Sequence, residues 1–200
     1  GGLSAINWGV VQTALIAIVV SPMVAFTVAF LAMLGLSRLQ RRLRVPEDAK
    51  AFKGLQLLSA AAVSFGHGAN DAQKTMGIIA LALVASGNLD EDFSRPPTWV
   101  IVSAALAMAA GTYAGGWRII RTLGTRIAKI DPPQGFAAQT SCATMLWTTA
   151  HFGFPVSTTH VISGSVMGAG ATRGLHAVRW GVAGNIVTAW IFTIPMAGLV

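Results

Sequence analysis

Long blocks of apolar residues constrain this chain more than any other feature of its sequence. The blocks at residues 8–36, 54–86 and 99–117 approach or exceed the ~20 residues that carry a helix across the ~30 Å hydrocarbon layer of a bilayer. Charged residues make up only 10% of the chain, and its mean hydropathy is +0.63. The sequence therefore predicts an all-α, multi-pass protein of the cell membrane.

Basic residues gather in the segments between these blocks. Residues 37–53 carry six basic side chains against two acidic ones, whereas residues 87–97 carry three acidic side chains and one arginine. Because lysine and arginine mark the cytoplasmic side, we expect residues 37–53 to form a cytoplasmic loop of a bacterial inner-membrane protein. The net charge of +7 does not indicate a nucleic-acid partner, since no basic stripe is interleaved with exposed aromatic residues.

The apolar residues after position 130 fall into shorter pieces. Residues 135–150 and 156–171 are each shorter than the ~20 residues needed for a crossing. A chain that enters the membrane and returns keeps the following Arg173 and Arg179 in the cytoplasm, so we predict a re-entrant helical hairpin over 135–171. The other elements expected in this region are an interfacial helix at 117–130 and a last spanning helix at 180–200.

Polar residues interrupt two of these apolar segments. The run GHGANDAQK occupies positions 66–74, and the run FPVSTTH occupies positions 154–160. Non-helical backbone at membrane depth persists only against protein or a water-filled cavity, and Gly66, Gly68 and Pro155 permit such backbone. We therefore predict that the helix over 54–86 is broken at the first run, and that both runs line a site.

The first run offers the ligands of a cation. Asn70, Asp71 and Gln73 supply oxygen atoms that suit a hard cation. Asp71 is the only acidic residue within the apolar blocks, and an ionisable residue in a membrane span normally marks a pathway or a site. Lys74 follows three residues later, so on a helix it would share a face with Asp71 and neutralise it.

The second run offers the donors of an anion site. Ser157, Thr158 and Thr159 place hydroxyl groups beside the free N–H groups of a helix that begins after Pro155. An equally strong alternative is that these hydroxyls cap the helix or bond to the preceding turn.

The histidines and the single cysteine have simpler interpretations. His67 and His160 are candidate ligands or proton carriers, but we favour hydrogen-bonded interior histidines. Cys142 is expected to be a small packing residue. No pair of histidine, cysteine or acidic residues has the spacing of a structural metal site, so none is predicted.

The two runs together resemble the paired signatures of a known family. GANDAQKTMG (68–77) and PVSTTH (155–160), with DPPQGF before the hairpin and VRW before the last helix, are similar to the inorganic phosphate transporter family, PiT. The resemblance implies two inverted repeats, each with one copy of both runs, that move phosphate in symport with Na⁺ or H⁺. It implies no bound cofactor, and for some bacterial members a divalent metal carried with phosphate.

The resemblance also implies roles for single residues. Phosphate would be bound by Ser157, Thr158, Thr159, Asn70 and Gln73. The coupling cation would be bound by Asn70, Asp71, Ser157 and Thr158. Candidate proton or charge partners are Lys74, His67 and His160.

This chain departs from the family pattern in two ways. Gln73 and Lys74 stand where the more familiar GANDVAN form has small or amide residues, and an ammonium there would occupy or repel part of a Na⁺ site. We therefore expect coupling to H⁺. Each run occurs only once, so the chain looks like the C-terminal half of a longer chain, or a half-sized protein that pairs with a second subunit as a homo-oligomer.

Two rival functions use the same residues. A membrane-embedded hydrolase would use Ser157 as nucleophile, together with Asp71 and either His67 or His160. A non-transporting scaffold subunit would keep the fold without using the site.

Overall fold

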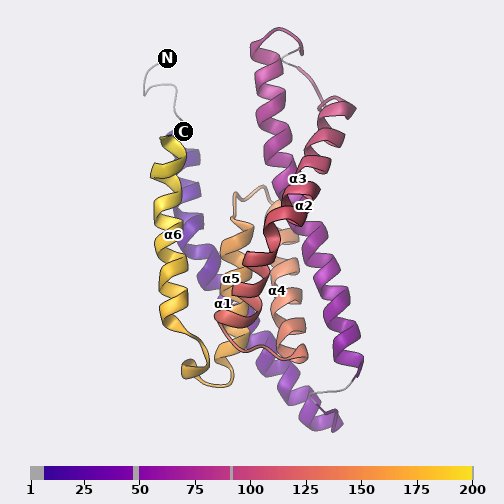
Figure 1. Cartoon of the computed structure of the whole chain (residues 1–200), viewed down its shortest axis with the longest axis vertical. Helices are drawn as coiled ribbons and strands as arrows, with labels where there is room; N and C mark the ends of the chain where they lie inside the picture. Colours follow the sequence, from indigo (N-terminus) through magenta and orange to yellow (C-terminus); the bar gives the residue numbers. More distant parts are fainter. Residues whose placement is uncertain (1–6, 47–49, 91, 200) are drawn as a thin grey trace.

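The structure, a computed structural model, describes residues 7–46, 50–90 and 92–199 and is helical over most of these ranges (Figure 1). A π-helical turn, η2 (Thr122–Arg126), follows the third helix, and a short 3-10 turn, η3 (Leu175–Ala177), precedes the last. Within the described ranges the α-helices are α1 (Trp8–Leu43), α2 (Lys50–Ala85), α3 (Thr98–Arg121), α4 (Pro132–His151), α5 (Thr158–Ala171) and α6 (Trp180–Gly198).

In the described part of the chain, two helices are long and apolar enough to cross a membrane. They are α1, with a mean hydropathy of 2.5 in its most apolar window, and Thr98–Trp117 of α3, with 1.4. Only 17% and 11% of these windows are buried inside the molecule, and large side chains such as Ile16 and Leu106 are exposed. So much exposed apolar surface is typical of helices that face lipid or a partner.

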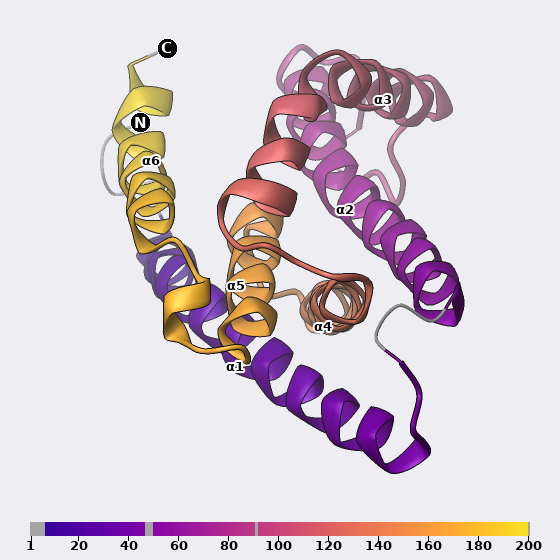
Figure 2. The same cartoon turned by 60° about the horizontal axis from the view of Figure 1, so that its bottom comes forward.

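The hairpin formed by α4 and α5 lies at the centre of the molecule (Figures 1 and 2). α5 packs against α1 on one side, α4 packs against α2 on the other, and α3 packs outside α2. Asp131, the N-cap of α4, forms an ion pair with Arg173, just beyond α5. We call this end the hairpin base, and the connection at residues 152–157 the hairpin tip.

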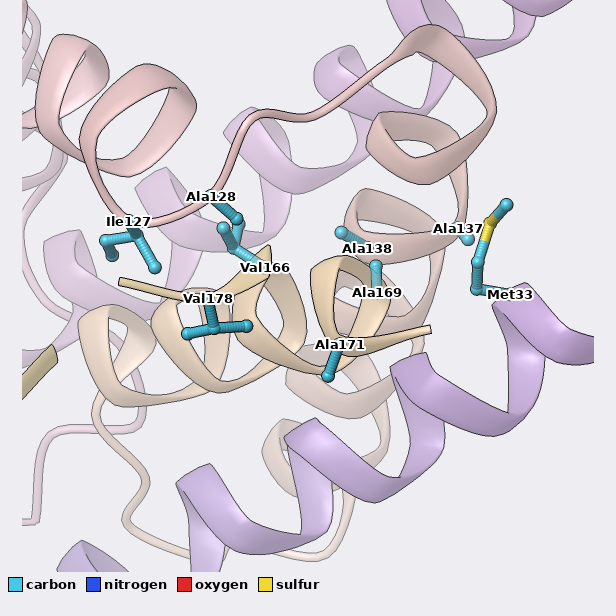
Figure 3. Close-up of a cluster of buried hydrophobic side chains, with 9 residues drawn as sticks. All are labelled: Met33, Ile127, Ala128, Ala137, Ala138, Val166, Ala169, Ala171 and Val178. Carbon is cyan, nitrogen blue, oxygen red and sulfur yellow. The ribbon is translucent and has the colours of Figure 1, made fainter. Parts of the chain in front are cut away.

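Small buried side chains hold the hairpin base together. Ala128 and Val178 form an isolated antiparallel bridge, and the Arg179 N–H donates to the Ile127 carbonyl at 2.8 Å. These bonds join the connection before α4 to the connection after α5. Most of the surrounding core residues are alanines, which let helices approach closely. The buried cluster (Figure 3) consists of Met33, Ile127, Ala128, Ala137, Ala138, Val166, Ala169, Ala171 and Val178.

Two glycines bring α5 against the backbone of α1. Gly164 lies against Pro22, and Gly168 lies against Phe26. A Cβ added at Gly168 would lie 2.8 Å from the carbonyl carbon of Phe26, closer than real Cβ atoms come to a neighbour. The steps of four residues on both helices show that α1 and α5 run parallel in register, with small residues at the contact.

The helix that carries the first polar run is continuous, so the predicted break within 54–86 is wrong. α2 extends from Lys50 to Ala85 through residues 66–74. A glycine costs a helix only ~1 kcal/mol relative to alanine, so it permits a break without forcing one. Here Gly66 allows α2 to approach α4, because a Cβ at this position would lie 3.1 Å from Nε1 of Trp147.

Two other predicted elements have different limits. Much of the loop predicted over 37–53 is helical, since α1 continues to Leu43 and α2 begins at Lys50; residues 47–49 lie outside the described residues. The arginines and leucines there are good helix formers, so their charge does not end α1. The interfacial helix predicted over 117–130 ends early, because the chain joins the bridge at Ala128.

The contact of α5 with α1 can be tested by adding one methyl group. Gly168→Ala should lower the free energy of unfolding by ~1–3 kcal/mol, because the added Cβ meets backbone rather than a movable side chain. Thermal or denaturant unfolding of the detergent-solubilised protein measures this loss. Gly184→Ala in α6 is the matched control, since nothing lies within 4 Å of a Cβ there. Equal stability of the two variants would contradict the described contact.

Candidate functional site

α2 and α4 run parallel, which places the first polar run at the hairpin tip. Ser59 donates a hydrogen bond to Oε1 of Gln139 at 2.8 Å, 80 positions further along the chain, and the rings of Phe65 and Trp147 stack with centroids 5.6 Å apart. Residues of α2 therefore lie level with residues roughly 80 positions later, as expected for helices with equal rise. By this register Asn70 and Asp71 reach the end of α4, beside the tip.

Asp71 has two basic neighbours on its own helix. Its carboxylate lies 3.0 Å from Nζ of Lys74 and 3.4 Å from Nδ1 of His67. The spacings of three and four residues place all three side chains on one helical face, and the Asp71 side chain is 26% exposed. The predicted neutralisation of Asp71 by Lys74 is confirmed, so the only acidic residue of the apolar blocks is held in an ion pair.

The two amides of the first run behave differently. Nδ2 of Asn70 donates to the Gly66 carbonyl at 2.8 Å, and the amide oxygen of Asn70 has no hydrogen-bond donor among the described residues. Gln73 is exposed, and its amide has no hydrogen-bond partner within residues 7–46, 50–90 and 92–199. Both amides are therefore available to a ligand, and their predicted roles stay predictions.

The hydroxyl groups of the second run lie at the N-terminus of α5. Ser157 is the N-cap of α5 but makes no side-chain capping bond, Thr158 is buried, and Thr159 is exposed. None of the three hydroxyls has a hydrogen-bond partner among the described residues. The alternative in which these hydroxyls cap the helix is therefore not what the structure contains. They lie beside the first N–H groups of α5, which have no helical acceptor.

The two polar runs lie at the same end of the hairpin. α2 packs against α4, and α4 packs against α5, so α4 lies between the two helices that carry the runs (Figure 2). Among the described residues, no hydrogen bond or ion pair joins Asn70 or Asp71 to the hydroxyl groups of the second run. The cation site shared by Asn70, Asp71, Ser157 and Thr158 stays a prediction.

His160 is a hydrogen-bonded interior histidine, as favoured from the sequence. It is 6% exposed, and its Nδ1 lies 3.3 Å from the carbonyl oxygen of Ile18 in α1. Its ring centroid lies 3.9 Å from that of Trp190 in α6. Sequence reasoning missed both partners, although Pro22, four residues after Ile18, was a signal, because proline removes the N–H that would bind that carbonyl.

Comparisons with protein families and with individual proteins point to the same family. A model of the phosphate transporter family matches residues 40–200. A probable low-affinity inorganic phosphate transporter of Mycobacterium tuberculosis is 48% identical over 200 residues, which are 100% of this chain and 48% of that protein. A protein of the same name from Rhizobium meliloti is also 48% identical. That match spans 100% of this chain and 59% of the Rhizobium protein. The chain thus spans about half the length of such relatives, which are named as transporters and not as enzymes.

A solved structure has the same fold. The sodium-dependent phosphate transporter superposes with a TM-score of 0.78 over 97% of this chain and 65% of that chain, at 23% sequence identity. This similarity supports the arrangement of helices described above.

The parallel register of α2 and α4 can be tested by cross-linking. In a Cys142→Ala background, Ser59→Cys with Gln139→Cys should react with a short bifunctional thiol reagent, because the native side chains are in hydrogen-bond contact at 2.8 Å. Cross-linking is read as a mass shift of the proteolytic fragments. Ser64→Cys with Gln139→Cys is the control, since residue 64 lies more than a helical turn further along α2. Equal reaction of both pairs would contradict the register.

Proposed function

The chain belongs to the phosphate transporter family, and on that premise we propose that it carries inorganic phosphate across a cell membrane together with a cation. The observation that carries this proposal is the open start of α5, where three hydroxyl groups without partners among the described residues lie beside the first-turn N–H groups. We propose in addition that the hairpin re-enters the membrane, so that its tip lies at depth.

The phosphate would be held mainly at the tip. Phosphate is an anion at neutral pH, and moving it bare into hydrocarbon is prohibitive. Hydroxyl groups of Ser157, Thr158 and Thr159 would replace part of its hydration, and the start of α5 contributes roughly half a positive charge. The amides of Asn70 and Gln73 would add donors from α2.

The cation would be held beside Asp71. A cation and an anion bound near each other in a low-dielectric site lower each other's cost, and this mutual stabilisation couples their movements. Because no hydrogen bond or ion pair joins Asp71 to these hydroxyl groups in the described part of the chain, we propose that a second repeat completes the site. That repeat would lie in the same longer polypeptide or in a second subunit of a homo-oligomer.

Lys74 favours a proton as the coupling cation. Its ammonium lies 3.0 Å from the Asp71 carboxylate, so it occupies the position that a Na⁺ ion bound to this carboxylate would need. A proton needs no such space, because it can be carried on a side chain such as His67, 3.4 Å from Asp71. We keep a divalent metal carried with phosphate as the alternative cation; like Na⁺, it would require the Lys74 ammonium to move away from Asp71.

The hydrolase alternative lacks its catalytic contacts. Nδ1 of His160 lies against the Ile18 carbonyl, and the Ser157 hydroxyl has no hydrogen-bond partner among the residues that the structure describes. A serine nucleophile needs a base within hydrogen-bond reach. Phosphate uptake distinguishes the scaffold alternative, because a scaffold subunit would not itself bind phosphate at the tip.

Removing one tip hydroxyl should weaken phosphate uptake. Thr159→Val is expected to raise the KM for phosphate roughly 10-fold or more, because a hydrogen bond to a charged group contributes ~1.5–3 kcal/mol. Uptake of labelled phosphate into proteoliposomes that contain the complete protein measures this change. Thr144→Val on α4 is the control, since its exposed hydroxyl already bonds to the Thr140 carbonyl at 2.9 Å. A scaffold subunit would show the same phosphate flux with and without either change.

The coupling ion can be tested separately from phosphate transport. The unchanged protein should take up phosphate in a pH gradient at equal Na⁺, and gain little from a Na⁺ gradient at clamped pH. Lys74→Asn should make uptake respond to Na⁺, because it removes the ammonium 3.0 Å from Asp71. Strong Na⁺-dependent uptake by the unchanged protein would contradict proton coupling and leave the phosphate proposal intact.

A further inference from the structure

Pro22 leaves one backbone carbonyl of α1 without its usual donor. In a helix the carbonyl of Ile18 binds the N–H of the residue four positions later. That residue is Pro22, which has no N–H, although α1 continues through it. An unpaired carbonyl is costly in a membrane interior, so another group has to bind it.

His160 is that group. Its Nδ1 lies 3.3 Å from the Ile18 oxygen, from a position 142 residues later in the chain. Since a carbonyl oxygen only accepts hydrogen bonds, Nδ1 carries the proton and donates. The side chain is 6% exposed, and the indole of Trp190 lies against its ring. Two polar groups that would each be costly to bury alone therefore satisfy one another.

The contact belongs to the register that joins α5 to α1. His160, Gly164 and Gly168 follow each other at steps of four, and they face Ile18, Pro22 and Phe26, which also follow at steps of four. Gly164 and Gly168 contribute close van der Waals packing, whereas His160 adds a directional hydrogen bond. It lies nearest the hairpin tip, in the first turn of α5 and directly after Thr159.

We propose that His160 is a positioning residue for phosphate binding. By bonding to the carbonyl that Pro22 leaves free, it fixes the rotation and height of the first turn of α5 against α1. The hydroxyl groups of Ser157, Thr158 and Thr159 and the adjacent N–H groups then keep the arrangement that an anion needs. His160 itself does not touch the phosphate. The inference rests on the proposed phosphate transport.

The first test varies the donor while keeping a side chain in place. His160→Leu fills a similar volume without a donor and should raise the KM for phosphate roughly 10-fold, with a smaller effect on the maximal rate. His160→Asn places an amide N–H where Nδ1 stood and should restore most of the affinity. Equal KM values for these two variants would show that His160 only fills space, and would overturn the inference.

The second test supplies the missing N–H to α1. Pro22→Ala gives the Ile18 carbonyl its helical donor again, so His160→Leu should raise KM less than roughly 3-fold in that background. Independent effects of the two changes would overturn the inference. Uptake into proteoliposomes is normalised to the amount of complete protein inserted, and His160→Gln, with a more distant donor, replaces His160→Leu if the latter does not accumulate.

The two proposals fail differently in this experiment. If the unchanged protein takes up no phosphate, both the transport proposal and the role of His160 in it are wrong. If the unchanged protein transports phosphate and the Pro22 and His160 changes multiply KM independently of each other, only the positioning role is wrong. A KM that rises in His160→Leu, returns in His160→Asn and rises little in the Pro22→Ala background supports the role.

Discussion

The structure depends on the need of every backbone polar group in hydrocarbon for a hydrogen-bond partner. The two helix starts of the hairpin meet this need in opposite ways. At α4, Asp131 accepts from the Gln134 N–H at 2.9 Å, and Oε1 of Gln134 accepts from the Asp131 N–H at 3.3 Å, which closes that start with its own side chains. At α5, Ser157 makes no such bond. The hairpin thus has one capped helix start at its base and one start without a side-chain cap at its tip.

Buried contacts hold the hairpin at both of its ends. At the base, the alanine cluster, the bridge between Ala128 and Val178 and the ion pair of Asp131 with Arg173 join the two arms. Nearer the tip, a second buried cluster joins α1, α4 and α5; it consists of Ala25, Cys142, Leu146 and Val161. The bond of His160 to Ile18 adds a directed contact in the first turn of α5. The position of the tip hydroxyl groups therefore follows from the packing of α5 against both α1 and α4.

The sequence predicted the helical membrane class, a pair of short helices over 135–171 and the shared helical face of Asp71 and Lys74, because each depends on local apolar length or local spacing. It misread Gly66, since a glycine in a polar run looks the same whether it breaks a helix or makes room for Trp147 from another helix. It predicted an interior, hydrogen-bonded His160 without its partner, because that partner is 142 residues away. Yet Pro22 alone shows that the Ile18 carbonyl lacks its helical donor. A search for buried side-chain donors to such carbonyls would have suggested the pairing of His160 with Ile18.

The packing of α4 between α2 and α5 (Figure 2) makes the distance between Asp71 and the start of α5 decisive for the proposed coupling. Helices pack with axes ~8–10 Å apart, so a cation held one helix away from the phosphate would lie ~9 Å further from it than direct contact would place it. At an effective dielectric of ~20, the attraction of two unit charges falls from ~4 kcal/mol at 4 Å to ~1.3 kcal/mol at 13 Å. The larger value would couple two fluxes strongly, whereas the smaller is about what an ordinary hydrogen bond contributes. On the proposed function, tight coupling would therefore need further groups at the tip that bring cation and phosphate into contact, and a second repeat would supply them.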